Sequence, residues 1–184
     1  NYKWILKFHN NTPSPQKNFV FYDETVDPRL KFTRIDYSRL MEGNYGIGKQ
    51  IHTIVKRIIL TMEDGSTKEI QSEADKDGNG LIDLTKYGTV VGWRMEMKDD
   101  FVLQSGQGIT LNSYTSFKDP EKTRYDENDA TKNVYKNTGR VTYKTQSNVA
   151  KDQSADWTFK LIPLKESFEI AKTTDYNDVR YTDG

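Results

Sequence analysis

Cysteine is absent from this sequence of 184 residues, and histidine occurs only twice. The lack of cysteine excludes disulfides, thiolate metal ligands and cysteine nucleophiles. His9 and His52 are the only imidazoles, so a Ser-His-Asp triad or a histidine metal cluster has few candidate parts. No apolar run approaches the length of a transmembrane helix, and we expect no membrane insertion of this segment.

Net charge is also lacking, because 27 Lys and Arg residues balance 27 Asp and Glu residues. We therefore expect no long-range attraction to nucleic acid and no nucleic-acid partner. What the sequence does contain is aromatic side chains, including 11 Tyr and 8 Phe. A chain this rich in aromatic residues can bury a sizeable core, so we expect it to fold rather than to be disordered.

The dominant pattern along the chain is alternation of apolar and polar residues, which is typical of strands with one buried face. Trp93, Met95 and Met97 give the clearest example. Their strand should be central, because each side chain contributes roughly 1.5 to 3 kcal/mol when fully buried. The pattern predicts an all-β, antiparallel immunoglobulin-like β-sandwich with long loops and at most a short helix over 48–53. The predicted strands are 4–9, 18–22, 30–35, 55–62, 67–72, 91–97, 101–103, 109–117, 134–145 and 157–164.

The predicted organisation is a single β-sandwich domain over residues 1–172, followed by a tail or linker over 173–184. The tail is acidic and contains tyrosines. Because the chain begins at Asn1 rather than at a methionine, we interpret it as a segment of a longer protein with flanking domains.

Residues 75–86 match an EF-hand loop up to its last position. Oxygen-bearing side chains stand at positions 1, 3, 5 and 9, and Gly80 falls at the sharp-turn position 6. Position 12 is Lys86, whose ammonium group cannot ligate a cation. Two interpretations stay open, a polar hairpin turn before the 91–97 strand and a weak calcium site. The calcium candidates are Asp75, Asp77, Asn79 and Asp83.

A second incomplete motif runs from Gly43 to Lys49, with the glycine and lysine spacing of a phosphate-binding loop. The next residue is Gln50, which has no hydroxyl for Mg²⁺, and no apolar strand precedes the first glycine. We interpret this segment as a Gly-rich surface loop, and calcium is the only cofactor for which the sequence offers candidates.

A sugar-hydrolysing cleft is built from carboxylates and aromatic residues, and this sequence contains both. The acidic residues occur as adjacent pairs such as Asp99-Asp100, and neighbours in a strand point to opposite faces, so the pairs suit turns better than catalysis. Some aromatic rings could form a glycan-stacking surface, although core packing is the default interpretation. The rings concerned belong to Tyr2, Trp4, Tyr22, Trp93, Tyr125, Tyr135, Tyr143 and Trp157.

Five short motifs follow one another along the chain. They are residues 2–11 around Trp4, residues 18–23 ending in Asp23, and residues 30–32, 83–88 and 135–143. In this order they resemble the immunoglobulin-like repeats of Gram-positive wall-anchored adhesins, including collagen-adhesin-type domains. The resemblance implies a surface stalk or ligand-binding module, often crosslinked by a Lys–Asn isopeptide bond beside a buried acid. Asp23 matches that acid, and Asn137 with Lys3 or Lys7 is the arrangement that this sequence offers, of which we take Lys7. A turn residue is the alternative role for Asp23.

The predicted function is accordingly that of a non-enzymatic extracellular domain of a bacterial cell-surface adhesin, located at the cell wall. Such a domain acts as a stalk spacer or binds a host glycan or an extracellular-matrix protein. The alternative is a carbohydrate-binding or carbohydrate-active accessory module with an aromatic sugar platform.

Overall fold

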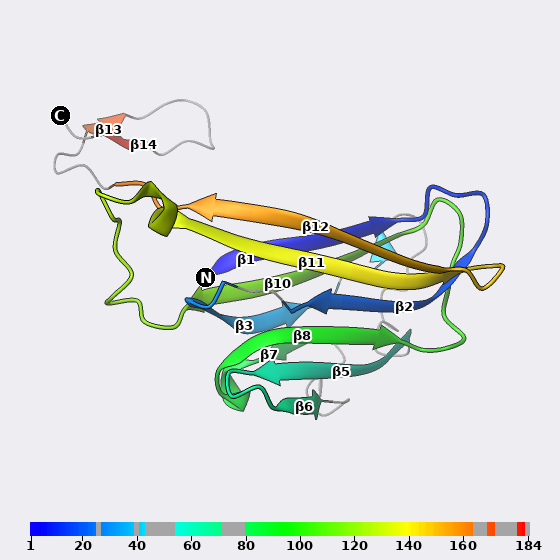
Figure 1. The fold of residues 1–184 in the computed structure, drawn as a ribbon. Coiled ribbons are helices and arrows are strands. Elements are labelled where there is room, and N and C mark those ends of the chain that lie inside the picture. Colours follow the sequence, from blue (N-terminus) through cyan, green and yellow to red (C-terminus); the bar gives the residue numbers. More distant parts are fainter. Residues whose placement is uncertain are drawn as a thin grey trace. The chain divides into compact units, whose positions relative to one another are not determined.

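The computed structural model describes residues 1–24, 27–38, 41–42, 54–70, 80–163, 169–171 and 180–182 (Figure 1). It is built of short strands joined by turns, with two short 3-10 helices, η2 and η3, among the described residues. The strands are β1 (Tyr2–His9), β2 (Gln16–Asp23), β3 (Leu30–Asp36), β4 (Met41–Glu42), β5 (Val55–Met62), β6 (Thr67–Ile70), β7 (Leu81–Asp83), β8 (Val90–Met97), β9 (Val102–Leu103), β10 (Gly108–Phe117), β11 (Val134–Thr145), β12 (Ala150–Lys160), β13 (Glu169–Ala171) and β14 (Arg180–Thr182); η2 spans Thr85–Tyr87 and η3 spans Ala130–Asn133.

The strands pair in the order β1-β10-β3-β8-β2-β11-β12, with β5, β6, β7, β4 and β9 attached to this path. Each strand pair with a described register is antiparallel. The predicted all-β, antiparallel fold class is therefore confirmed. In the part of the chain that the structure describes, no helix is long and apolar enough to cross a membrane.

Strand β8 is central, as its sequence predicts. It pairs with β5, β2 and β3, and its side chains alternate between a buried and a half-buried face. Trp93 is only 1% exposed and lies opposite Leu60 of β5 and Asp23 of β2. An interior strand of this kind satisfies its backbone groups on both sides while burying its large side chains, so it organises the core.

The two ends of the strand path approach each other across the core. Gly139 of β11 lies so close to β1 that a Cβ atom at this position would be 2.7 Å from Leu6 Cδ1 and 3.1 Å from Trp157 Cζ3 of β12. A side chain at this position would have to displace Leu6 and the ring of Trp157, so glycine allows the strands to approach this closely. The contact brings β1 over β11 and closes the sandwich around its buried residues.

Half of the eight aromatic residues considered for a sugar platform are buried. Trp4, Trp93, Tyr135 and Tyr143 are buried, which confirms core packing for these four. Trp157 keeps 37% of its surface exposed, and Tyr125 is similarly accessible. The four buried rings are therefore not available to a sugar platform.

The structure differs from the sequence-based prediction around residues 81–88 and in β12. Residues 81–83 form β7, which pairs with β3, so Asp83 belongs to a strand and not to a hairpin turn. Strand β12 begins at Ala150, seven residues before the predicted strand, because its largely polar first half pairs with the preceding strand without burying a face. The helix predicted over 48–53 lies outside the described residues.

The chain divides into two compact units. One comprises Asn1–Thr123 with Lys136–Thr158, and the other Arg124–Tyr135 with Phe159–Gly184. A single domain over 1–172 stays a prediction of the sequence. In the second unit the rings of Tyr135 and Phe159 stack at 4.8 Å, and the Leu161 amide donates to the Asn133 carbonyl.

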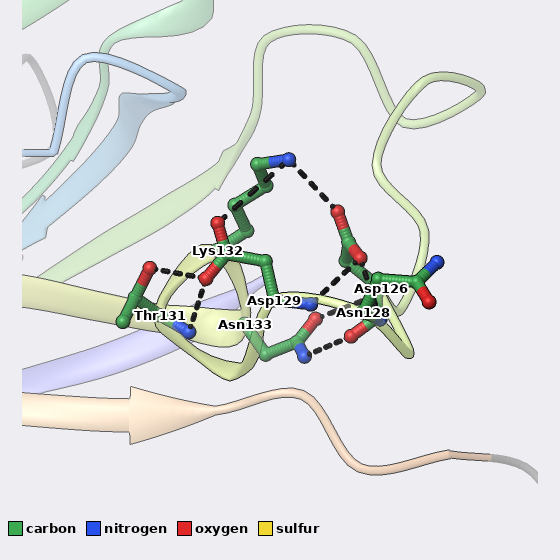
Figure 2. A network of polar contacts seen from close by, with 6 residues as sticks. All are labelled: Asp126, Asn128, Asp129, Thr131, Lys132 and Asn133. Carbon is green, nitrogen blue, oxygen red and sulfur yellow. Dashed lines mark hydrogen bonds and ion pairs between the residues drawn. The ribbon is translucent and has the colours of Figure 1, made fainter.

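The loop before β11 in the second unit is closed by its own polar side chains (Figure 2). Asp126 accepts hydrogen bonds from the backbone amides of Asn128 and Asp129, and Lys132 Nζ lies 3.1 Å from its other oxygen. Asn133 bridges to the backbone of Asp126 in both directions. The Asp126 carboxylate thus holds the loop, and its bonds to Lys132 and to the Asn128 amide lower its pKa.

Candidate functional site

A buried polar group lies in the core of the first unit, where three strands meet. Asp23 is the last residue of β2, Ser113 lies in β10 and Asn137 in β11, and they are 4%, 3% and 1% exposed. Ser113 Oγ donates a 3.0 Å hydrogen bond to Asp23 Oδ2. Burying a polar side chain costs folding free energy unless it is hydrogen-bonded, so three such residues at one point set this part of the core apart from its apolar remainder.

Burial raises the pKa of Asp23 to about 7, although the hydrogen bonds from Asn137 and Ser113 oppose the shift. The dominant cause is the loss of water around a charged carboxylate. Within the described residues, Asp23 Oδ1 and Asn137 Oδ1 have no hydrogen-bond partner of good geometry. A proton on Asp23 supplies the donor that this pair of acceptors lacks, so the neutral acid suits the site better than the carboxylate.

Lys7, the third residue of the predicted crosslink, is not brought to this group. In β1 the side chains of Trp4 and Phe8 are buried and that of Leu6 is half-buried, whereas Lys7 is exposed. Successive side chains of a strand leave on opposite faces, so Lys7 points away from the core that holds Asn137. The structure thus joins Asp23 with Asn137, adds Ser113, and places Leu6 near Gly139 of the same strand as Asn137.

The intact mass of the protein tests the crosslink directly. A Lys–Asn isopeptide bond releases ammonia, which lowers the mass by about 17 Da. The exposed position of Lys7 favours the unmodified protein. We then expect both the natural protein and the Lys7→Arg variant to have the masses calculated from their sequences. A loss of about 17 Da that disappears both in Lys7→Arg and in Asn137→Asp would establish the bond between Lys7 and Asn137.

Of the four calcium candidates, only Asp83 lies within the described residues; Asp75, Asp77 and Asn79 fall outside them. Asp83 Oδ1 accepts hydrogen bonds from the Thr85 hydroxyl at 2.6 Å and from the Thr85 amide at 2.9 Å. These bonds lower the pKa of Asp83 and hold Thr85, the first residue of the 3-10 helix η2. No group of three His, Asp or Glu residues in the described ranges could hold a metal ion. The Gly43–Lys49 segment also lies outside those ranges.

Calcium is expected to leave the melting temperature unchanged, because Asp83 is engaged with Thr85 and Lys86 stands at the last ligand position. The measurement is thermal unfolding in about 5 mM CaCl₂ against the same buffer with EDTA. A stabilisation that the Asp77→Ala variant removes would show that residues 75–83 bind calcium after all.

A groove lies at one end of the first unit, between the β1–β2 loop and the β11–β12 turn, which meet at the same end of the sheet (Figure 1). Its volume is about 520 Å³, within the range of small-molecule sites. Proline, valine and tyrosine side chains provide apolar walls, and hydroxyl and amide groups provide hydrogen-bonding partners. The lining residues are Thr12, Ser14, Pro15, Gln16, Tyr143, Thr145, Gln146, Ser147, Val149 and Lys151.

Sequence reasoning missed both the groove and Ser113. The groove joins segments more than 120 residues apart, and neither segment carries a catalytic or metal-binding motif. The only local signal was the pair of prolines at 13 and 15, which indicates a loop but not a site. Ser113 stands in a predicted strand, and no sequence pattern shows that its hydroxyl meets Asp23.

Fold and site together define an all-β antiparallel domain with a buried acid–amide pair and a polar groove at one end. No protein-family description matches the sequence, and no curated protein is significantly similar to it. Among solved structures the chain is similar to ACE19, described as the collagen-binding subdomain of the Enterococcus faecalis surface protein ACE. The identity is 12%, 86% of each chain is covered, and the TM-score is 0.42.

Proposed function

We propose that this chain is a non-enzymatic extracellular domain of a bacterial cell-surface adhesin, which binds a host glycan or matrix ligand through the groove at its end. The observation that carries the proposal is the composition of the groove. Among the described residues that line it there is no Asp, Glu or His, the commonest general acids and bases, and its hydroxyl, amide and apolar groups are suited to holding a ligand. A surface of this kind is suited to binding.

The position of the groove supports the same function. Loops held by a rigid sheet scaffold are common binding surfaces, because the scaffold orders them before the ligand arrives. Tyr143 anchors the floor through ring contacts with Phe8 at 5.0 Å and Phe19 at 5.4 Å. The order of the adhesin-like sequence motifs supports a location at the bacterial surface.

An array of glycans and matrix proteins, probed with the full chain, tests the proposal. We expect saturable binding to at least one surface, and loss of that binding in Ser147→Trp, which fills the groove from its exposed turn. Ser154→Trp is the matched control, since Ser154 is exposed on β12 and does not line the groove. Absence of saturable binding, or equal binding by both variants, would contradict the proposal.

A further inference from the structure

The last strand of the sheet path, β12, has one edge that no described strand covers. It is 11 residues long, about twice the length of an ordinary strand, and within the described residues it pairs with β11 on one side only (Figure 1). Every residue of β12 except Phe159 is exposed. A long uncovered edge presents a row of backbone donors and acceptors, so it is a ready template for another strand.

The backbone hydrogen bonds at the two ends of β12 show which of its residues face that edge. The Thr145 amide donates to the Val149 carbonyl just before the strand, and the Leu161 amide donates to the Asn133 carbonyl just after it. Successive residues of a strand direct their backbone groups to opposite sides, so the odd-numbered residues bond to β11. The amides and carbonyls of the even-numbered residues therefore point to the free edge.

The devices by which natural proteins protect such an edge are scarce in β12. Residues 150–158 include no proline, and both of their acids are held by the neighbouring strand. Asp152 accepts hydrogen bonds from Arg140 at 2.9 and 3.0 Å, and Asp156 lies 2.7 Å from Lys136 Nζ. Because these contacts engage both carboxylates with β11, the edge carries little charge that would repel an incoming strand.

The sequence of β12 suits antiparallel pairing with a copy of itself. In full overlap the two strands are related about the middle residue, Ala155, and even-numbered residues face even-numbered ones, as the free backbone groups require. Asp152 then faces Thr158, Asp156 faces Ser154, and no two like charges lie opposite each other. The next registers on either side set Asp152 against Asp156, or Asp156 against itself. Charge therefore selects the register of full overlap.

We propose that two copies of this chain pair through β12, antiparallel and centred on Ala155, to form one continuous sheet. The exposed apolar surface of the strand fits this partner, because Trp157 keeps 37% of its surface exposed and lies on the same face as Ala155. In the pair its ring lies opposite Gln153 of the second copy, which covers part of it. The inference goes beyond the proposed function and does not depend on it, since β12 contributes only Lys151 to the groove.

Single cysteines test the register directly, because the natural chain contains none. In the proposed pair the two Ala155 residues face each other without a mutual hydrogen bond, at a Cα separation of about 4.5 Å, which a disulfide can span. Gln153→Cys is the matched control on the same exposed face, since its twin lies about 13 Å away along the strand. We expect the full chain with Ala155→Cys to form a disulfide-linked dimer at least about tenfold faster than Gln153→Cys under mild oxidation.

Sedimentation of the natural full chain, from about 5 µM to about 1 mM, tests the association itself. We expect a reversible equilibrium between monomer and dimer, because pairing along one strand edge buries little surface. Ser154→Pro should weaken this dimer at least about tenfold, since it removes an amide that points to the free edge. The same change breaks no hydrogen bond to β11, so the melting temperature should change little.

Three results would each overturn the pairing. They are equal rates of crosslinking by the two cysteine variants, a natural chain that stays monomeric at about 1 mM, and a dimer that Ser154→Pro leaves intact. If Ser154→Pro lowers the melting temperature strongly, the comparison of Ala155→Cys with Gln153→Cys decides the question by itself. Binding to the array of glycans and matrix proteins is a separate readout, so failure of the dimer leaves the proposed function standing.

Discussion

The Asp23→Asn variant is expected to be more stable than the natural protein at pH 8. Its free energy of unfolding should also depend less on pH between about 4 and 7. In the folded chain the pKa of Asp23 is raised from 3.8 to about 7 by burial. Between these values the folded state holds a proton that the unfolded chain has released. The free energy of unfolding therefore falls as pH rises, and the loss is complete above about pH 7.

The expected size of this effect is about 4 kcal/mol, from the difference between the two pKa values of Asp23. Asparagine has the same shape and carries no charge at any pH, so the variant avoids the cost of burying a carboxylate. Its amide also offers a donor to Asn137 Oδ1, which lacks one within the described residues. The neighbours that act on the Asp23 carboxyl, Ser113 and Asn137, are both uncharged, so the titration belongs to Asp23 itself.

Urea unfolding at a series of pH values from about 4 to 9 measures the effect. Asp64→Asn is the control, because Asp64 is exposed and its pKa is lowered by bonds to Ser66. Stability due to Asp64 is present at neutral pH and is lost as pH falls, opposite in direction to Asp23. A natural protein whose stability is flat from pH 4 to 7, or an Asp23→Asn variant with an unchanged slope, would contradict the buried neutral acid.

The Gly80→Ala variant is expected to lose about 2 to 4 kcal/mol of stability. Gly80 has a φ angle of +74°, which residues with a side chain rarely adopt. A Cβ atom here would lie 2.6 Å from the Ser38 nitrogen and 3.0 Å from the Tyr37 carbonyl carbon. These are backbone atoms at the end of β3, tied to Gly80 by the 2.8 Å hydrogen bond from the Tyr37 amide, so they cannot move aside.

Gly65→Ala is the matched control for this second prediction. Gly65 has a similar φ of +82°, but no atom lies within 4 Å of the position that its Cβ would take. The control should therefore lose only the conformational part, about 1 kcal/mol. Equal losses in both variants, measured by urea unfolding, would show that the contact with Ser38 is unimportant. Urea unfolding of the same two variants with and without CaCl₂ tests whether Gly80 also contributes to calcium binding.

Local alternation of apolar and polar residues was sufficient to predict several of the strands. The alternation of residues 91–97 predicted both a strand and its central place, and β8 pairs with three other strands. Residues 134–145 form β11 with the predicted bounds. Patterns of this kind are reliable because a strand with one buried face shows its period in the sequence whatever its partners are.

The site could be predicted only in part. Asp23 and Asn137 came from the resemblance to adhesin repeats, and the structure buries both residues in one polar group. Lys7 stands in the first strand as the resemblance requires of a candidate, but its side chain leaves on the exposed face. Choosing between neighbours in a strand requires knowledge of which face is buried, and a shift of one residue reverses the answer.

Gly80 illustrates the same distinction in the EF-hand-like motif of residues 75–86. Its place at the sharp turn of an EF-hand pattern correctly singled it out, yet its described role is to pass close to the backbone of Ser38. Strand β7, which follows it, pairs with β3 rather than entering a hairpin. The motif identified a glycine that the chain requires, and the neighbouring strand supplied the reason.

By itself the sequence determined the all-β class, the position of most strands and the absence of thiol chemistry, because these depend on residue type and short-range period. Only the tertiary structure decided that Asp23 meets Ser113 and Asn137, that Lys7 faces outward, and that residues 12–16 and 143–151 enclose a groove. Those facts depend on strand order and register, which join residues far apart in the chain. Pairing between distant strands is set by how the whole core packs, and no short stretch of sequence records it.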